Sequence, residues 1–171
     1  MTRRAQQGLS HMTRRAKQGY FLSPQAKKFK RPESVLVVVY TRTGKVLLLK
    51  RADAPDFWQS VTGGLLWEET EPRQAAAREL REETGVEATE DLRNLQLTYR
   101  YPILPRWRPR YAPEVRENTE HVFALELPAE ILITENPAEH ASHGWFTFDE
   151  AAVKVASWTN REVIVKLKAK G

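Results

Sequence analysis

The sequence contains no cysteine and no long apolar run, and these two absences exclude several classes of protein. Without cysteine the chain has neither disulfides nor thiolate metal ligands, which fits a reducing compartment, so we expect a cytoplasmic protein. No apolar run approaches the roughly 20 residues that a membrane-spanning helix needs. Because 41% of the 171 residues are hydrophobic, the chain can still bury a substantial core. We therefore expect one globular domain with no membrane contact.

Acidic residues are absent from segment 1–31, which contains nine basic side chains. The other 140 residues carry 18 basic and 22 acidic side chains, so the net charge of +5 comes from this segment. The segment also nearly repeats itself, because Met1–Ala5 recurs as Met12–Ala16. We interpret residues 1–30 as a basic, disordered N-terminal extension and residues 31–171 as the folded domain. A mildly acidic domain does not favour nucleic-acid binding, which leaves only the extension for contact with RNA or DNA.

Strands and helices alternate along the remainder, which predicts an α/β sandwich around a mixed sheet. Runs of β-branched and other apolar residues predict strands at 34–40, 45–50, 95–101, 120–127 and 144–148. The pair Thr43-Gly44 suits a hairpin turn between the first two strands. The glycines Gly63 and Gly64 allow close backbone approach or a positive φ.

Three helices are expected. The first covers 73–84, with Pro72 in its first turn and Gly85 ending it in the left-handed conformation. Its residues Ala76 and Leu80 should face the core. A short helix should follow 148–150, and a last one should run from Arg161 to about Lys168, capped by Thr159-Asn160.

The first helix presents an unusual group of charges, because Glu79, Glu82 and Glu83 lie on one face. Like charges at this spacing repel by roughly 0.2–0.5 kcal/mol per pair, a cost that folding alone would not favour. A hard divalent cation removes the cost, since Mg²⁺ or Mn²⁺ takes carboxylate oxygens and also holds a substrate phosphate. The alternative interpretation is a solvated acidic helix face.

Segment 101–118 contains four prolines and four arginines, which is too much proline for a central strand. It could be an irregular surface connection. Its arginines and its flat side chains Trp107 and Tyr111 also suit an anionic ligand that carries a ring. Arg110 is a candidate to bind phosphate oxygens.

The acidic helix resembles the Nudix box, whose pattern is G-x5-E-x7-R-E-U-x-E-E-x-G-U with U aliphatic. The second half matches at every fixed position: Arg78, Glu79, Leu80, Glu82, Glu83, Gly85 and Val86. The resemblance implies the Nudix fold and hydrolysis of a diphosphate linkage with Mg²⁺, for which Mn²⁺ could substitute. The first half departs from the pattern, because Thr70 stands at the glutamate position counted from Gly64. Counted from Gly63, Glu69 is in place but eight residues instead of seven precede Arg78, so Glu69 and Glu71 both stay candidates.

Five further segments are similar to one bacterial branch of this family, which acts on dihydroneopterin triphosphate in folate synthesis. They are 31–32, 55–63, 110–113, 118–120 and 157–161. This resemblance implies metal-dependent hydrolysis of dihydroneopterin triphosphate to the monophosphate and pyrophosphate. The partner is thus a small-molecule triphosphate, and a monomer and a dimer are equally compatible with the sequence.

The resemblance also implies roles for individual residues. The expected metal ligands are Glu79, Glu83, Glu82, Glu139 and Gly63, and a box glutamate or Glu139 would act as the general base. Arg78 would hold a box glutamate through charge-assisted hydrogen bonds. The expected substrate-binding residues are Arg110, Tyr111, Trp58, Asn118 and Arg31. His140 and His143 lack a third clear ligand, so we do not expect zinc.

Three other functions remain open at this point. The chain could hydrolyse general or damaged nucleoside triphosphates by the same chemistry. It could remove 5′ pyrophosphate from RNA with help from its basic extension. It could also be a non-catalytic Nudix-like nucleotide-binding module, which the altered spacing before Arg78 would suit.

Overall fold

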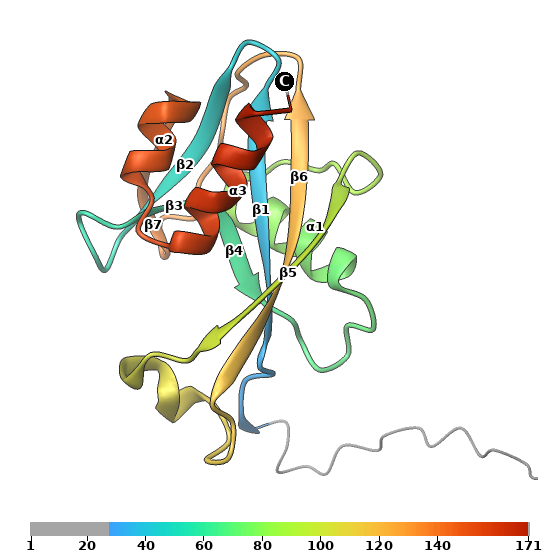
Figure 1. Cartoon of the computed structure of the whole chain (residues 1–171), viewed down its shortest axis with the longest axis vertical. Helices are drawn as coiled ribbons and strands as arrows, with labels where there is room; N and C mark the ends of the chain where they lie inside the picture. The colour runs from blue at the N-terminus through green and yellow to red at the C-terminus, as the bar shows by residue number, and fades with distance from the viewer. Residues whose placement is uncertain (1–27, 171) are drawn as a thin grey trace, which may run out of the picture.

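The structure is a computed structural model that describes residues 28–170. The interpretation of the basic extension therefore lies almost wholly outside the described residues. A seven-stranded mixed sheet separates helix α1 (Pro72–Thr84) on one face from helices α2 (Phe148–Lys154) and α3 (Trp158–Lys168) on the other (Figure 1). This arrangement confirms the predicted α/β sandwich. Within 28–170, no helix combines the length and apolarity needed to cross a membrane.

The sheet has the order β3-β2-β1-β6-β5, while β4 pairs with β1 and β7 pairs with β2. Strands β1 and β6 run parallel, and the other pairs are antiparallel. All five predicted strands are present, together with two short ones that the sequence did not predict. Their bounds are β1 Glu33–Thr41, β2 Lys45–Arg51, β3 Trp58–Gln59, β4 Val61–Gly64, β5 Arg93–Pro102, β6 Glu117–Leu127 and β7 His140–Thr147.

Strand β1 is buried on both faces because its side chains alternate between the two layers. One set packs against α1, and the other packs beneath α2 and α3. The predicted core residues Ala76 and Leu80 of α1 are fully buried in the first layer. The rigid double-sided core fixes the ends of β1, β4 and β6, where the polar residues described below emerge.

Both ends of α1 are closed as the sequence predicts. Pro72 stands in the first turn, and Glu71 and Gln74 form a capping box before it. Gly85 ends the helix with a φ of 74°, in the left-handed region that glycine adopts without strain. Gly44 likewise has a φ of 85° in the predicted hairpin turn. Neither Gly63 nor Gly64 has a positive φ among the described residues, so only the close-approach alternative holds there.

The predicted start of the last helix is wrong. Helix α3 begins at Trp158, three residues before Arg161, and its N-cap is Ser157, whose side chain accepts from the Asn160 backbone N–H. Asn160 is buried inside the helix and binds Ser60, donating to its hydroxyl and accepting from its backbone N–H, both at 2.9 Å. A sequence pattern cannot distinguish a polar residue used as a cap from one used in such a long-range contact.

The proline-rich segment is irregular, as expected. Strand β5 ends at Pro102 and β6 begins at Glu117, and between them lies only a short 3-10 helix, η2 (Pro105–Arg110). It projects beyond the sheet at the end where β1 and β6 begin (Figure 1).

Candidate active site

The three glutamates of α1 line one cavity but differ in exposure. The side chain of Glu83 is 2% exposed, that of Glu79 is 12% exposed and that of Glu82 is 48% exposed. Burial, aided by the charges of Glu83 and Glu82, raises the pKa of Glu79 to about 7, although Arg78 opposes the shift. Burial also raises the pKa of Glu83. Two of the three glutamates on this face of the helix are therefore removed from solvent, and only Glu82 is solvated.

Arg78 connects the loop before α1 to the acidic face of the helix. Its Nε donates to Glu69 Oε1 at 2.8 Å, and its Nη2 donates to Glu69 Oε2 at 3.2 Å and to the Gly64 carbonyl at 2.9 Å. Its Nη1 donates to Glu79 at 2.6 Å and to Glu82 at 3.2 Å. The expected contact between Arg78 and a box glutamate is thus present.

These contacts favour Glu69 over Glu71 as the first box glutamate. Glu69 is buried and held by Arg78, whereas Glu71 is exposed and occupied in the capping box. Because α1 runs without interruption from Pro72, the extra residue is accommodated before the helix starts. The altered spacing therefore leaves the geometry of the acidic face intact.

Gly63 in β4 lies directly against the acidic helix. A Cβ atom added at Gly63 would overlap the carboxylate of Glu79. At Gly64 the nearest atom to an added Cβ is the Glu33 carbonyl oxygen, at 3.8 Å, which is ordinary contact. Gly63 thus creates the space in which the Glu79 carboxylate sits.

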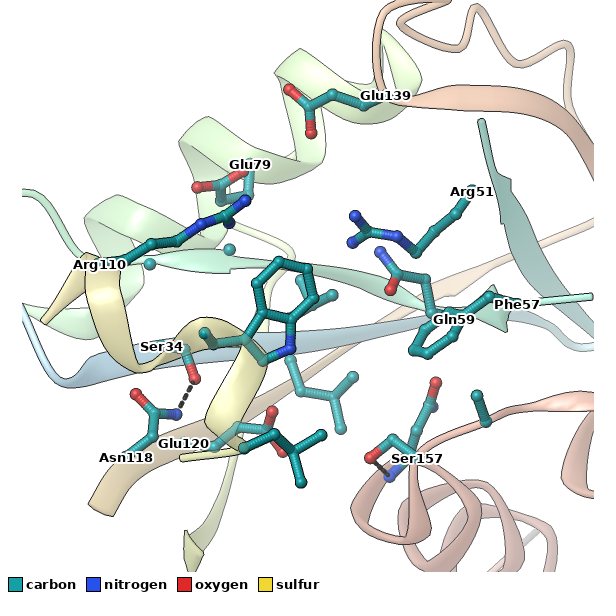
Figure 2. Close-up of a pocket in the computed structure, with 18 of the residues that line it drawn as sticks. Ser34, Arg51, Phe57, Gln59, Glu79, Arg110, Asn118, Glu120, Glu139 and Ser157 are labelled. Carbon is teal, nitrogen blue, oxygen red and sulfur yellow. Dashed lines mark hydrogen bonds between the residues drawn. The ribbon is translucent and has the colours of Figure 1, made fainter. Parts of the chain in front are cut away.

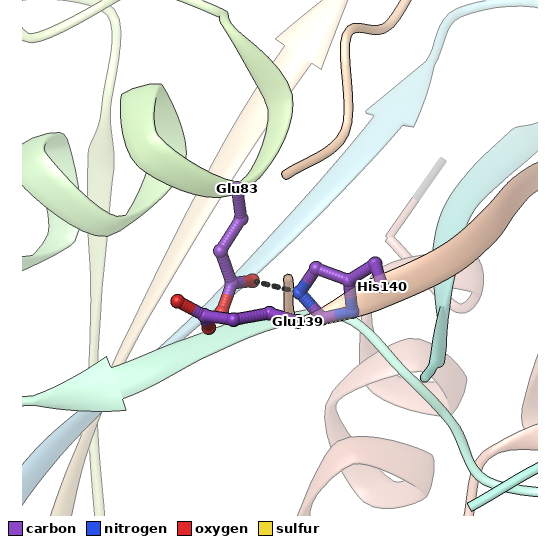
Figure 3. A group of neighbouring side chains, drawn as sticks. All are labelled: Glu83, Glu139 and His140. Carbon is purple, nitrogen blue, oxygen red and sulfur yellow. Dashed lines mark ion pairs between the residues drawn. The ribbon is translucent and has the colours of Figure 1, made fainter. Parts of the chain in front are cut away.

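A second acidic group comes from the start of β7. Glu83, Glu139 and His140 each offer a ligand atom, and these atoms lie within 4.8 Å of one another (Figure 3). His140 is buried, and its Nε2 lies 3.5 Å from Glu83 Oε2, longer than an ordinary hydrogen bond of about 2.7–3.2 Å. Neither ring nitrogen has a hydrogen-bond partner within the described part of the chain. His143 is separate, because its Nδ1 lies 2.9 Å from Glu135 Oε2.

Next to the acidic groups the cavity becomes cationic. Lys30, Arg51, Arg106 and Arg110 line it. Three of these surround the ring of Trp107: the guanidinium carbons of Arg110, Arg106 and Arg51 lie 4.4, 5.0 and 5.8 Å from its centroid. Arg51 is also held by Asp53 through two hydrogen bonds of 2.7 Å. Positive charges on a flat aromatic surface suit phosphate groups attached to a ring.

The other end of the cavity is uncharged except for one buried carboxylate. Asn118 and Glu120 of β6 lie there with Ser34 of β1, opposite Glu79 and Glu139, while Arg51 and Arg110 lie between the two ends (Figure 2). The whole cavity has a volume of about 1190 Å³. That is enough for a ring and a phosphate chain, since small-molecule sites usually measure about 300–1,000 Å³.

The comparisons with known proteins agree with this geometry. The model of the NUDIX domain matches residues 30–167 of the chain. This protein belongs to the Nudix family. It is 44% identical over 142 residues to the dihydroneopterin triphosphate diphosphatase of Escherichia coli K12, covering 81% of this chain and 93% of that one. It is 38% identical over 143 residues to the Haemophilus influenzae protein of the same name, covering 81% and 89%.

A solved structure agrees as well. The E. coli dihydroneopterin triphosphate pyrophosphohydrolase superposes with a TM-score of 0.75 at 42% identity, over 85% of this chain and all of that one. The Nudix fold and the enzyme class, a hydrolase acting on phosphoric anhydride bonds, follow from these matches.

Most of the predicted site residues of this Nudix chain meet in the cavity, but three do not line it. The predicted residues that do are Gly63, Glu79, Glu82, Glu83, Arg110, Tyr111, Asn118 and Glu139. Arg78 does not line the cavity but donates hydrogen bonds to Glu69 and Glu79. The predictions for Trp58 and Arg31 are not supported by the geometry.

Trp58 points away from the cavity because adjacent strand residues face opposite sides, and its neighbours Phe57 and Gln59 line the cavity. Its ring packs edge-on against Phe146 at 5.2 Å, beneath α2. Arg31 instead supports the loop before α1, donating to the Glu69 carbonyl at 2.7 Å and pairing with Glu33.

Sequence reasoning missed several residues of the cavity. Arg51 ends a strand where a solvated charge is ordinary, and only its place beside Trp107 reveals it. Glu120 stands at the start of the apolar run 120–127 from which the strand is predicted, a place where a charged side chain is usually solvated, yet it is buried. His140 was expected merely to pack or face water, yet it joins Glu83 and Glu139. For Glu120 the sequence did contain a signal, because the similarity of segment 118–120 to the family branch indicated that strand β6 takes part in the site.

The donors at the acidic end fit a divalent cation, on which the family depends. Carboxylate oxygens from two separate elements converge there. Arg78 is paired with Glu79 and Glu82. No lysine or arginine among the described residues pairs with Glu83 or Glu139, and burial raises the pKa of both Glu79 and Glu83. The nitrogens of His140 also have no hydrogen-bond partner within residues 28–170. Oxygen-rich donor sets of this kind bind hard cations such as Mg²⁺ and Mn²⁺.

Proposed function

We propose that this protein hydrolyses dihydroneopterin triphosphate to dihydroneopterin monophosphate and pyrophosphate, a step of folate synthesis. The observation that carries the proposal is the order of charges along one cavity. Carboxylates lie at one end, cationic side chains in the middle, and Ser34, Asn118 and Glu120 at the other end. The proteins with 38–44% identity are named for this substrate.

The cationic middle of the cavity would hold the triphosphate chain. Arg51 and Arg110 present donors to phosphate oxygens while their planes rest near Trp107. Asp53 orients Arg51 in the free protein through a bidentate contact, so little side-chain freedom is lost when phosphate binds. The phosphate nearest the acidic end then lies between the arginines and the glutamates.

We further propose that Glu79, Glu82, Glu83 and Glu139 hold Mg²⁺, or Mn²⁺ in its place. When bound, such a cation offsets phosphate charge and lowers the pKa of water. Glu139 or a glutamate of α1 accepts the proton as water attacks phosphorus. The phosphoric anhydride bond between the monophosphate and pyrophosphate portions breaks, and its bridging oxygen keeps the electron pair on the portion that water does not attack. Arg78 keeps Glu79 in position throughout.

A substrate panel with pyrophosphate detection tests the proposal. Dihydroneopterin triphosphate and dATP are offered side by side, with Mg²⁺ and with a chelator. We expect metal-dependent turnover with a clear preference for the pterin substrate. A large preference for dATP would instead identify a general nucleoside triphosphate pyrophosphatase.

The non-catalytic alternative loses its main support in this structure. It was based on the altered spacing before Arg78, but Glu69 still reaches Arg78 through two hydrogen bonds. All three helical glutamates are also present and face the cavity.

A further inference from the structure

Two buried oxygen atoms at the ring end of the cavity have no hydrogen-bond donor. They are Asn118 Oδ1 and Glu120 Oε1. Within residues 28–170, five buried side-chain nitrogen or oxygen atoms are partnerless, and four of them belong to residues lining this cavity. Since most buried polar groups in proteins are satisfied, this concentration calls for a ligand that supplies the missing partners.

The neighbouring hydrogen bonds explain why these two oxygens remain free. Asn118 Nδ2 donates to Ser34 Oγ at 2.7 Å and to the Tyr101 hydroxyl at 3.1 Å. The Tyr101 hydroxyl in turn donates to Glu120 Oε2 at 3.0 Å. The network therefore fixes both side chains and leaves one acceptor on each.

Retaining a carboxylate here works against the stability of the free protein. Glu120 is 5% exposed, and no lysine or arginine forms an ion pair with it among the described residues. Burial raises the pKa of Glu120, and the nearby hydroxyls of Thr159 and Tyr101 oppose the shift. Of these two hydroxyls only that of Tyr101 lies within hydrogen-bond geometry of Glu120, and it donates to Oε2, so Oε1 stays without a donor. A residue needed only for folding would be better served by an amide or an apolar side chain.

We propose that Glu120 and Asn118 select the ring of the substrate by accepting hydrogen bonds from the donor edge of a 2-amino-4-oxopyrimidine. This edge carries a ring N–H and an adjacent amino group, so it presents neighbouring donors to neighbouring acceptors. Hydrogen bonds to a carboxylate are charge-assisted and stronger than neutral ones. The inference rests on the proposed function, because the pterin ring of dihydroneopterin triphosphate contains this edge.

The position of the pair agrees with such a role. Glu120 and Asn118 lie at the end of the cavity opposite Glu79 and Glu139, with the phosphate-binding arginines between (Figure 2). A substrate whose phosphates occupy the middle thus extends its ring toward β6. Both residues line the cavity, but Glu120 Oε1 itself is shielded from water in the free protein, so binding of the ring requires a local movement of the cavity wall.

The test compares the wild-type protein with Glu120→Gln and, as a control, Glu126→Gln. Glu126 lies on the same strand, is exposed and pairs with Arg42 outside the cavity. Turnover is measured with dihydroneopterin triphosphate and with its analogue that carries an oxo group in place of the 2-amino group. We expect the wild-type protein to prefer the amino substrate at least about tenfold in kcat/KM, since a site built on hydrogen bonds rejects an analogue that cannot make them.

In Glu120→Gln we expect kcat/KM for the amino substrate to fall about 10–100-fold, mainly through KM, and the preference to disappear. The Mg²⁺ concentration for half-maximal activity should not change, and the Tm without ligand should be equal or higher. Glu126→Gln should match the wild type. An unchanged KM and preference in Glu120→Gln would overturn the inference.

The outcomes separate the two proposals. If the wild-type protein does not hydrolyse dihydroneopterin triphosphate, the proposed function fails, and the inference fails with it. If it does so without discriminating against the 2-oxo analogue, only the inference fails. This wild-type comparison decides the question even if Glu120→Gln does not fold.

Discussion

Gly63→Ala should inactivate the protein while Gly64→Ala should not, although the two glycines are adjacent. Neither has a positive φ, so alanine suits the backbone at both positions. The difference is the space around the new Cβ. At Gly63 it would overlap the Glu79 carboxylate, and at Gly64 it meets nothing closer than 3.8 Å.

The magnitudes follow from what has to move. Gly→Ala at a compatible position stabilises a protein by about 0.4–1 kcal/mol through the unfolded chain, which is the expectation for Gly64→Ala. Gly63→Ala gains the same stabilisation through the unfolded chain. It must also displace the Glu79 carboxylate, which breaks the 2.6 Å hydrogen bond that Arg78 donates to it. A hydrogen bond between charged groups contributes about 1.5–3 kcal/mol, so we expect a net loss of about 1–2 kcal/mol. Misplacing a reacting group by about 1 Å can cost about 100-fold in rate.

Pyrophosphate release and urea unfolding measure the two effects on the same preparations. We expect Gly63→Ala to lose at least about 100-fold in kcat/KM and to require more Mg²⁺ for half-maximal activity. Gly64→Ala should stay within about threefold of the wild type, because its backbone carbonyl still accepts from Arg78. Wild-type activity and Mg²⁺ dependence in Gly63→Ala would refute the assignment of Glu79 to the metal site.

Three other substitutions test separate parts of the structure. Arg78→Lys keeps the charge but loses the two-point bond to Glu69, and urea unfolding should show a loss of about 2–3 kcal/mol, against almost none for exposed Arg81→Lys. Asn160→Ala leaves the Ser60 N–H buried without a partner, so its free energy of unfolding should fall by about 1–3 kcal/mol. Glu83→Gln should abolish pyrophosphate release. Because burial raises the pKa of Glu83 above its ordinary 4.5, its stabilising contribution is complete below that pH and is lost as the pH rises. Metal-free Glu83→Gln should therefore be more stable than the wild type at pH 7–8, with a difference that shrinks toward pH 4, and the reverse trend would contradict the burial argument.

Local patterns predicted the parts of the fold that depend on local chemistry. The left-handed cap at Gly85 and the first turn at Pro72 were predictable because one residue type suits each position. The start of α3 was not, because Asn160 reads as a cap but binds Ser60, a hundred residues away in sequence. Strand β3 has only two residues, too few for any periodicity to appear.

The site residues likewise divide into those that a local pattern predicts and those that only long-range packing places. The acidic helix was predictable because its glutamates recur at helical spacing within a single turn. Glu120 was not, because its burial arises from the packing of β6 against β1 and from contacts with Tyr101. The orientation of Trp58 was not predictable for a related reason. A two-residue strand gives no periodicity that indicates which side chain faces the cavity, and the ring of Trp58 packs against the core beneath α2 instead.

The order of charges along the cavity implies that the cation and the substrate bind cooperatively. In the free protein burial raises the pKa of Glu79 to about 7, so a substantial fraction of this carboxyl group is protonated at neutral pH. A divalent cation favours the ionised form and at the same time offers a positive charge to the incoming phosphates. Without it, phosphate that reaches Arg51 and Arg110 would face the carboxylates of Glu79 and Glu83 directly. Reciprocity of binding then requires that the triphosphate lower the apparent Kd for the divalent cation by the same factor as the cation lowers the Kd for the triphosphate.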